Sequence, residues 1–252
     1  MKINFKNLLK ELDRKLFLNL LRKTYNFYKK YKVNSLLSCY KKNNFLLNIS
    51  YINYNNNFLT QLCEKYKTDK GSINYNKKTN WGKPAHSYSN YYYSIFNHFK
   101  DDVKLVFEFG LGIVDGKSGA SLKVWKEYFK KAQIYGADID KNILFKQDRI
   151  KTYYVDQLDT RSIKEMWKKV KIKNFDIIID DGLHTAKAII NCFVNSFKKL
   201  KNNGVYIIED VKPLEIDDIM TKLKDYSPEL VTLRGNNFQQ FSDNNLIIVR
   251  NI

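Results

Sequence analysis

From about residue 104 to the C-terminus, short apolar runs alternate with longer segments whose apolar residues recur at helical spacing. Short runs of β-branched and aromatic residues indicate strands, and a period near 3.6 indicates helices. The predicted strands are 104–109, 133–139, 149–155, 175–180, 205–209, 229–234 and 246–250, and the predicted helices are 120–130, 160–169, 185–200 and 216–224. This alternation favours a Rossmann-like α/β fold with a mostly parallel, seven-stranded sheet.

The last two predicted strands lack a clear helix between them. The polar segment 238–244 suits a hairpin connection, so the final strand is predicted to run antiparallel. Upstream of the alternating region, the pattern predicts a helix over 58–66 and another from about 87 to 99. The chain therefore divides into a helical extension with an Asn-rich linker, a helical cap over the cofactor and substrate, and a catalytic domain, at 1–57, 58–103 and 104–252 respectively.

The predicted helix over residues 4–32 is strongly basic and amphipathic. Residues 1–57 hold 12 Lys and Arg against two acids, and so carry +10 of the formal net charge of +18. Two interpretations follow: the helix packs on the main domain or on a partner subunit of a homo-oligomer, or it rests on an anionic membrane surface. Because the excess charge lies mainly outside the predicted catalytic domain, the charge gives little support to nucleic-acid binding.

The bulk composition favours a folded cytoplasmic protein, with contact at the inner face of the membrane through residues 1–32 as the peripheral alternative. Hydrophobic residues make up 44% of the chain, which is enough for a buried core. The sequence has neither a long apolar stretch typical of a spanning helix nor a signal-peptide pattern at its start. Cys39, Cys63 and Cys192 are widely spaced without a CxxC pair, which favours free thiols in a reducing compartment.

A glycine-rich turn follows the first predicted strand of the catalytic domain. It includes Gly110 and Gly112, and glycine lets a backbone approach a ligand closely. The pattern lacks GxGxxG and places Glu108 just before the glycines, where a carboxylate would repel a pyrophosphate but attract a cationic ligand. S-adenosyl-L-methionine carries an ammonium and a sulfonium and no phosphate, so this turn favours it over a dinucleotide.

Acidic and amide side chains end the next two strands. Asp138 can accept hydrogen bonds from both ribose hydroxyls of a nucleoside, with Asp140 as the second choice. The alternative for Asp140 is a helix N-cap. Asp156 and Gln157 can hydrogen-bond an adenine edge, and loop capping is their alternative.

The most informative motif is the run Ile177 to His184, in which Asp180 and Asp181 end a buried strand. Adjacent carboxylates repel each other, so a cation is expected nearby. Glu209 and Asp210 end the next strand, and the topology brings them beside Asp181, in a set of oxygen ligands suited to Mg²⁺ or Mn²⁺. His184 is the candidate general base. The alternatives are solvated loop acids and a histidine that only caps or packs.

Taken together, these residues resemble the metal-dependent class I methyltransferases of the macrocin O-methyltransferase type, which methylate sugar hydroxyls. The resemblance covers roughly residues 60–250 and also includes the Lys-Tyr-Lys-Thr-Asp-Lys-Gly run at 65–71, His86 with Tyr88, and Gly-Ala-Ser-Leu at 119–122. It implies Asp181, Glu209 and Asp210 as metal ligands and His184 as the base. Around the cofactor it implies Glu108, Ser121, Asp138, Asp156 and Gln157, to which we add Gly110, Gly112 and Asp180. Leu183, where relatives often have Ser, and the short loop 113–118 depart from the family pattern.

The resemblance implies a methyltransferase that uses S-adenosyl-L-methionine and Mg²⁺ to O-methylate a sugar or sugar-derived metabolite. The expected partner is therefore a small-molecule acceptor, of the surface-polysaccharide or natural-product type. N-methylation of a small molecule and methylation of RNA are the alternatives within enzymes. A membrane-docked, cofactor-binding scaffold is the alternative outside them.

Overall fold

A computed structural model describes residues 46–51, 56–71, 86–234 and 243–252. The chain divides into two compact units, Met1–Asn44 and Phe45–Ile252, and the description below concerns the second unit. The predicted basic helix over 4–32 and Cys39 lie outside the described residues. Among the described residues, no helix combines the length and the apolar character needed to cross a membrane. Cys63 and Cys192 are buried free thiols, as predicted.

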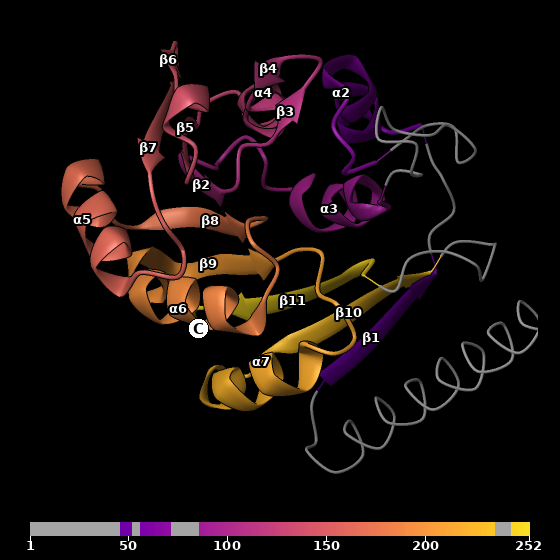
Figure 1. Cartoon of the computed structure of the whole chain (residues 1–252). Coiled ribbons are helices and arrows are strands. Elements are labelled where there is room, and N and C mark those ends of the chain that lie inside the picture. The colour runs from indigo at the N-terminus through magenta and orange to yellow at the C-terminus, as the bar shows by residue number, and fades with distance from the viewer. Residues whose placement is uncertain (1–45, 52–55, 72–85, 235–242) are drawn as a thin grey trace, which may run out of the picture. The chain divides into compact units, whose positions relative to one another are not determined.

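A twisted sheet with the strand order β1-β10-β11-β9-β8-β2-β5-β7-β6 forms the centre of the unit (Figure 1). The strands β7, β5, β2, β8 and β9 form a parallel core, and β11 runs antiparallel between β9 and β10. The antiparallel direction predicted for the final strand is therefore confirmed. The strand bounds are β1 Leu46–Tyr51, β2 Leu105–Phe109, β5 Gln133–Asp138, β6 Lys146–Gln147, β7 Ile150–Tyr154, β8 Phe175–Asp180, β9 Leu200–Ile208, β10 Glu229–Arg234 and β11 Asn245–Arg250.

The prediction of seven strands was wrong, because the described residues place nine strands in the sheet. The two additions are the short edge strand β6, which pairs antiparallel with β7, and β1, which pairs in parallel with β10. The segment Leu46–Tyr51 falls within the predicted Asn-rich linker 42–57. Its partner strand lies some 180 residues away in the sequence, so no local sequence pattern predicts the pairing. A truncation starting at residue 58 would remove this edge strand.

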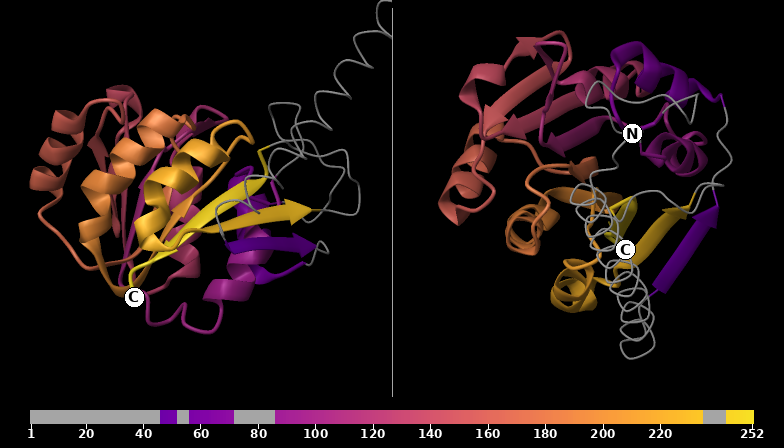
Figure 2. Two further views of the ribbon diagram at one scale, coloured as in Figure 1. Left: turned by 90° about the horizontal axis from the view of Figure 1, so that it is seen from below. Right: turned by 45° about the vertical axis from the view of Figure 1, so that its right-hand side comes forward.

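Helices cover both faces of the sheet, and alternate residues of each strand face the two layers. On one face, Phe107 of β2 contacts Trp167 of α5, and Tyr206 of β9 contacts Phe193 of α6. On the other face, Val106 of β2 joins a core with Tyr92 of α3 and Trp125 of α4. Figure 2 shows α5, α6 and α7 together in one layer. The helices are α2 Phe58–Tyr66, α3 Tyr88–Phe96, α4 Ala120–Tyr128, α5 Thr160–Val170, α6 Ala186–Ser196 and α7 Ile216–Leu223.

This two-face arrangement determines where the polar candidates point. Because Glu108 alternates with Phe107 and Phe109, its side chain faces the layer of α3 and α4. Glu209 follows Ile207 by two residues and faces the same layer. The carboxyl ends of β2, β8 and β9 thus direct their acids into the space beside α3, as expected for a site at the carboxyl edge of a parallel sheet.

A pocket of about 400 Å³ lies at the opposite end of the sheet, between Phe99, Lys201 and Arg250. Lys201 stands near the start of β9, and Arg250 ends the antiparallel β11. Their charges pair with Asp176 and Glu229. This pocket is therefore separate from the carboxyl edge on which the predicted site residues gather.

Candidate active site

The end of β2 is a tight junction with the end of β8. Gly110 adopts φ +85°, and a Cβ at this position would lie 2.0 Å from the carbonyl oxygen of Asp181. The Asp181 amide donates to the Phe109 carbonyl at 3.0 Å, which holds the two strand ends together. Gly112, with φ +58°, has open space where a Cβ would stand. The glycine turn thus combines a close backbone contact at Gly110 with open space beside Gly112, where a ligand can approach the backbone.

The close contact at Gly110 gives a stability prediction. Gly110→Ala is expected to lower the free energy of unfolding by about 3 kcal/mol or more, because the new methyl group meets backbone and the positive φ is strained. Gly116→Ala is the matched control, since Gly116 also has positive φ (+73°) but open space around its Cβ position. Urea denaturation should show a loss of only about 1 kcal/mol for that control. Equal losses for the two variants would contradict the proposed steric contact.

Glu108 is fully buried beneath the glycine turn. Its Oε2 accepts a hydrogen bond from Trp125 Nε1 at 2.6 Å. Burial raises the pKa of Glu108, while the Lys70 ammonium and hydrogen bonds from Trp125 and Ser121 act in the opposite direction. Ser121, in the first turn of α4, is thereby placed next to Glu108, as expected if both lie around one cofactor.

Asp138 ends β5 and joins two segments of the rim. Its carboxylate accepts from the Leu111 amide and from the Asp140 amide, each at 2.9 Å. A carboxylate has further lone pairs, so it can still accept from ribose hydroxyls. Asp140 instead accepts from the Asn142 amide at 2.9 Å and caps the short 3₁₀ turn Lys141–Ile143. The capping alternative therefore describes Asp140, and the ribose role of Asp138 stays a prediction.

Gln157 is the polar link between the loops after β7 and β8. Its Nε2 donates to Asp180 Oδ1 at 2.7 Å, and its Oε1 accepts from the Leu183 amide at 2.7 Å. Burial raises the pKa of Asp180 to about 7, with the Gln157 hydrogen bond as an opposing influence. Asp156 accepts from the Leu158 amide at 2.8 Å and so acts as a loop cap in the structure. These contacts place Asp180 and Gln157 under the rim and Asp156 at its surface.

Asp181, His184 and Asp210 form the candidate metal site. One possible ligand atom from each lies within 4.8 Å of the others. His184 Nε2 is 3.9 Å from Asp181 Oδ1 and 4.0 Å from Asp210 Oδ2. Two carboxylates and an imidazole at this separation fit a divalent cation. His184 and Asp210 both adopt positive φ, near +53° and +54°, and such strain in non-glycine residues gathers at functional sites.

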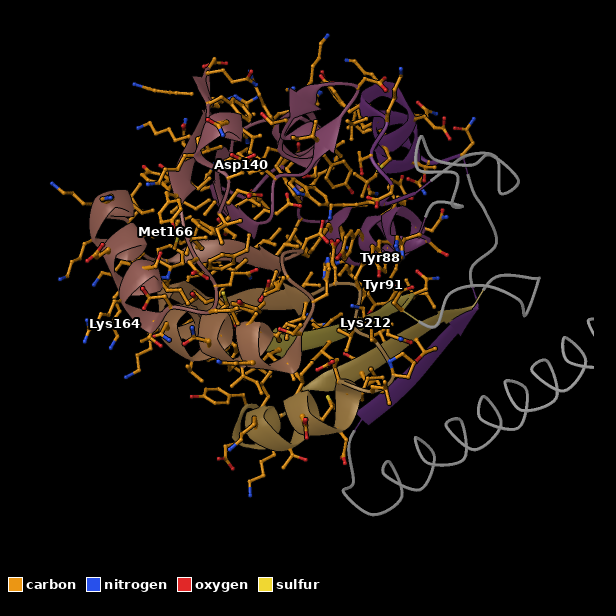
Figure 3. All side chains as sticks on the ribbon, viewed as in Figure 1. Tyr88, Tyr91, Asp140, Lys164, Met166 and Lys212 are labelled. Carbon is orange, nitrogen blue, oxygen red and sulfur yellow. The ribbon has the colours of Figure 1, made fainter. Side chains whose placement is uncertain are left out.

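Asp210 is oriented by two aromatic side chains from the segment 86–88. The Tyr88 hydroxyl donates to Asp210 Oδ1 at 2.7 Å, and His86 Nε2 lies 3.5 Å from the same oxygen. The two rings stack with centroids 4.8 Å apart. Figure 3 labels Tyr88 on α3 and Asp140 beyond β5, which come from opposite parts of the rim. Tyr88 and His86 therefore support the candidate metal site from the helical layer.

Glu209 has a different environment from the other predicted metal ligands. One of its oxygens accepts from the Tyr92 hydroxyl at 2.7 Å, and the other contacts the Lys70 ammonium. Burial raises the pKa of Glu209 well above its usual range, and Lys70 opposes that effect. The predicted set of Asp181, Glu209 and Asp210 is thus gathered at one edge, but His184 stands with the two aspartates and Glu209 is bound by a lysine and a tyrosine.

Sequence reasoning had not singled out Lys70, Tyr92 or Trp125 for any role. Lys70 is 2% exposed, and its Nζ lies 3.2 Å from Glu108 Oε1 and 2.6 Å from Asp181 Oδ2. Although burial lowers the pKa of Lys70, the three surrounding carboxylates raise it well above the usual range. In the sequence, only the run 65–71 drew attention to Lys70. That run contributes to the family resemblance, but it does not indicate where the side chain of Lys70 points.

Comparison with known proteins places this geometry in context. The chain matches no protein family model. It is 34% identical over 134 residues to the 8-demethyl-8-alpha-L-rhamnosyl tetracenomycin-C 2'-O-methyltransferase of Streptomyces olivaceus, covering 52% of this chain and 34% of that protein. It is 30% identical over 155 residues to the demethylmacrocin O-methyltransferase of Streptomyces fradiae, covering 61% of this chain and 36% of that protein. The chain thus spans about a third of the length of these curated relatives.

Solved structures similar to this chain also include a methyltransferase. The MycE methyltransferase of the mycinamycin biosynthetic pathway, in complex with Mg and SAH, superposes with a TM-score of 0.57 at 23% identity, over 79% of this chain and 55% of that chain. Its complex with Mg, SAH and mycinamycin VI gives 0.50 at 29% identity, over 60% and 38%. The domain has the class I methyltransferase fold. The predicted resemblance to macrocin-type sugar O-methyltransferases is confirmed, because the curated relatives are enzymes of that type.

Within this methyltransferase fold, the predicted residues occupy two neighbouring halves of one edge. The cofactor is expected around the ends of β2, β5, β7 and β8, at Glu108, Gly110, Gly112, Ser121, Asp138, Gln157 and Asp180. Asp181, His184 and Asp210 follow β8 and β9. Lys70 contacts carboxylates of both halves.

Proposed function

We propose that this protein uses S-adenosyl-L-methionine to O-methylate a sugar hydroxyl, with Mg²⁺ or Mn²⁺ held by Asp181 and Asp210 and with His184 beside them as the base. The observation that carries the proposal is the convergence of those three side chains within 4.8 Å, beside the glycine turn of β2. The relatives named as O-methyltransferases of rhamnosyl tetracenomycin and demethylmacrocin support a sugar-bearing acceptor. The acceptor class is a glycosylated natural product or a surface-polysaccharide precursor.

The residues of the cofactor half can hold each part of S-adenosyl-L-methionine. Glu108 places a negative charge beneath the turn, which favours the cationic amino acid portion, and the open space beside Gly112 lets that portion approach the backbone. Asp138 would accept hydrogen bonds from the ribose hydroxyls, and Asp156 and Gln157 are the predicted partners of the adenine edge. These residues would hold the cofactor next to the half that carries His184, so that the methyl donor and the acceptor bind side by side before reaction.

On the acceptor half, His184 is the candidate general base and the two aspartates are the candidate ligands. Asp181 and Asp210 would hold a divalent cation, which would supply Lewis-acid chemistry that lowers the pKa of the acceptor hydroxyl. His184 Nε2 accepts the hydroxyl proton, the acceptor oxygen forms a bond to the methyl carbon, and the carbon–sulfur bond breaks to release S-adenosylhomocysteine. Tyr88 holds Asp210 in place through its hydroxyl during this transfer. Glu209 is the further ligand that the family resemblance implies, and it stays a prediction.

The deciding experiment incubates the purified full chain with S-adenosyl-L-methionine, MgCl₂ and a panel of acceptors: rhamnosides, nucleotide sugars, small amines and an RNA transcript. We expect a mass gain of one methyl group on a sugar hydroxyl. We also expect EDTA to abolish the reaction and excess Mg²⁺ to restore it. Full activity in chelator would contradict the metal role. Methylation of the amine or RNA in place of the sugar would contradict the proposed acceptor.

A further inference from the structure

Lys70 is fixed between two helices before its side chain enters the site. Its amide donates to Thr68 Oγ1 at 3.0 Å, and its carbonyl accepts from the Ser89 amide of α3 at 2.8 Å. The next residue, Gly71, packs so closely on α3 that a Cβ there would lie 1.8 Å from Ser89 Oγ. The backbone therefore sets the direction of the lysine, because this segment has little room to move.

The ammonium group of Lys70 lies where three neighbouring strands end. Glu108 lies near the end of β2, Asp181 comes directly after β8, and Glu209 comes directly after β9. The sheet order places these three strands side by side. Its Nζ contacts all three carboxylates. Three carboxylates that contact one ammonium group lie close together, and like charges that are close together repel strongly when they are buried. The lysine is thus the internal cation that lets three acids share one edge of the sheet.

A buried ion bridge is a poor means of stabilising a fold, since well-packed apolar residues are often as stable. Its presence in this place requires another reason. Glu108 belongs to the cofactor half, whereas Asp181 belongs to the metal half. One group that contacts both can fix the distance between the two halves.

We propose that Lys70 is a positioning residue for methyl transfer: its ammonium ties Glu108 on the cofactor side to Asp181 and Glu209 on the metal side, and it limits the negative charge available to the divalent cation. The inference rests on the proposed function, because it assumes that both ligands bind at this edge. Lysine suits the role because its ammonium is a compact point charge that can lie among three acids, whereas a planar guanidinium pairs best with one.

Two consequences distinguish this role from simple packing. Without the ammonium, the acids lose their internal cation, so a divalent cation should bind about tenfold more tightly by Coulomb attraction. At the same time Glu108 and Asp181 lose their common anchor, so turnover should fall about 100-fold while the KM for the acceptor changes little. A packing defect alone would lower stability without strengthening metal binding.

The test compares Lys70→Met and Lys70→Arg with the wild-type chain and with Lys65→Met, which removes an exposed lysine of the same region that pairs with Glu127. Metal-stripped proteins are titrated with MgCl₂ while the melting temperature is followed, and S-adenosylhomocysteine binding is measured by calorimetry. We expect the Mg²⁺-induced rise in melting temperature to be about 3 °C larger for Lys70→Met than for wild type. Lys65→Met should match wild type.

Lys70→Arg keeps the charge and so provides a second variant if Lys70→Met fails to fold. It should show the wild-type response to Mg²⁺, but turnover should fall at least about tenfold because the larger head group displaces the carboxylates. One outcome would overturn this inference alone. In that outcome the wild-type chain binds S-adenosylhomocysteine and Mg²⁺, and the Lys70 variants match wild type in both their Mg²⁺ response and their turnover. A wild-type chain that binds neither would overturn the proposed function, and this inference with it.

Discussion

Replacing His184 with alanine should lower kcat by about 10²- to 10⁴-fold while the affinity for S-adenosylhomocysteine stays within about twofold of wild type. The imidazole is the basic group next to both Asp181 and Asp210, and its side chain is 25% exposed, so an acceptor can reach it. Single-turnover kinetics with saturating cofactor would measure the effect on the chemical step, and calorimetry would measure the binding.

His98→Ala is the matched control, because His98 is exposed on the segment after α3, where its ring meets that of Phe99 edge to face. It should retain wild-type turnover. A Mg²⁺ titration separates the two roles open to His184. If added Mg²⁺ restored full turnover to His184→Ala, the residue would be a metal ligand and its assignment as the base would be wrong.

At about 1 mM MgCl₂, Asp210→Asn should lower kcat/KM about 10²-fold or more. The variant should also need a higher Mg²⁺ concentration than wild type to reach half of its maximal rate. Asparagine has the shape of aspartate and can still accept from the Tyr88 hydroxyl, so the fold should persist. The substitution removes one of the two negative charges in the cluster of Asp181, His184 and Asp210. Measurement of initial rates across a MgCl₂ series would show both effects.

Asp218→Asn on the exposed surface of α7 is the corresponding control and should leave the Mg²⁺ dependence unchanged. An Asp210→Asn variant with the wild-type Mg²⁺ requirement would contradict the metal site. The same variant with intact metal response but weak cofactor binding would move Asp210 to the cofactor half.

Much of the fold follows from local pattern. The runs that end at Phe109, Asp138, Asp180 and Ile208 are short and mostly apolar, and each ends in an acidic residue or is followed by glycine or an acidic residue. Because parallel strands direct their carboxyl ends to one edge, the strand ends by themselves predict that these polar residues meet. The strand β1 was not predicted, because it pairs with β10, which is remote in the sequence.

The sequence by itself determined the alternation of strands and helices, the close turn at Gly110, and the edge at which Glu108, Asp181 and Asp210 gather. These features depend on periodicity and on backbone sterics, which act over a few residues. Only the tertiary structure decided that Lys70 lies among three carboxylates, that Glu209 is bound by Lys70 and Tyr92, and that His184 completes the candidate metal site. The first two outcomes depend on how α2 and α3 pack over the sheet, because a side chain can neutralise a distant charge only after folding has placed it there. The third depends on how the segments after β8 and β9 lie beside each other.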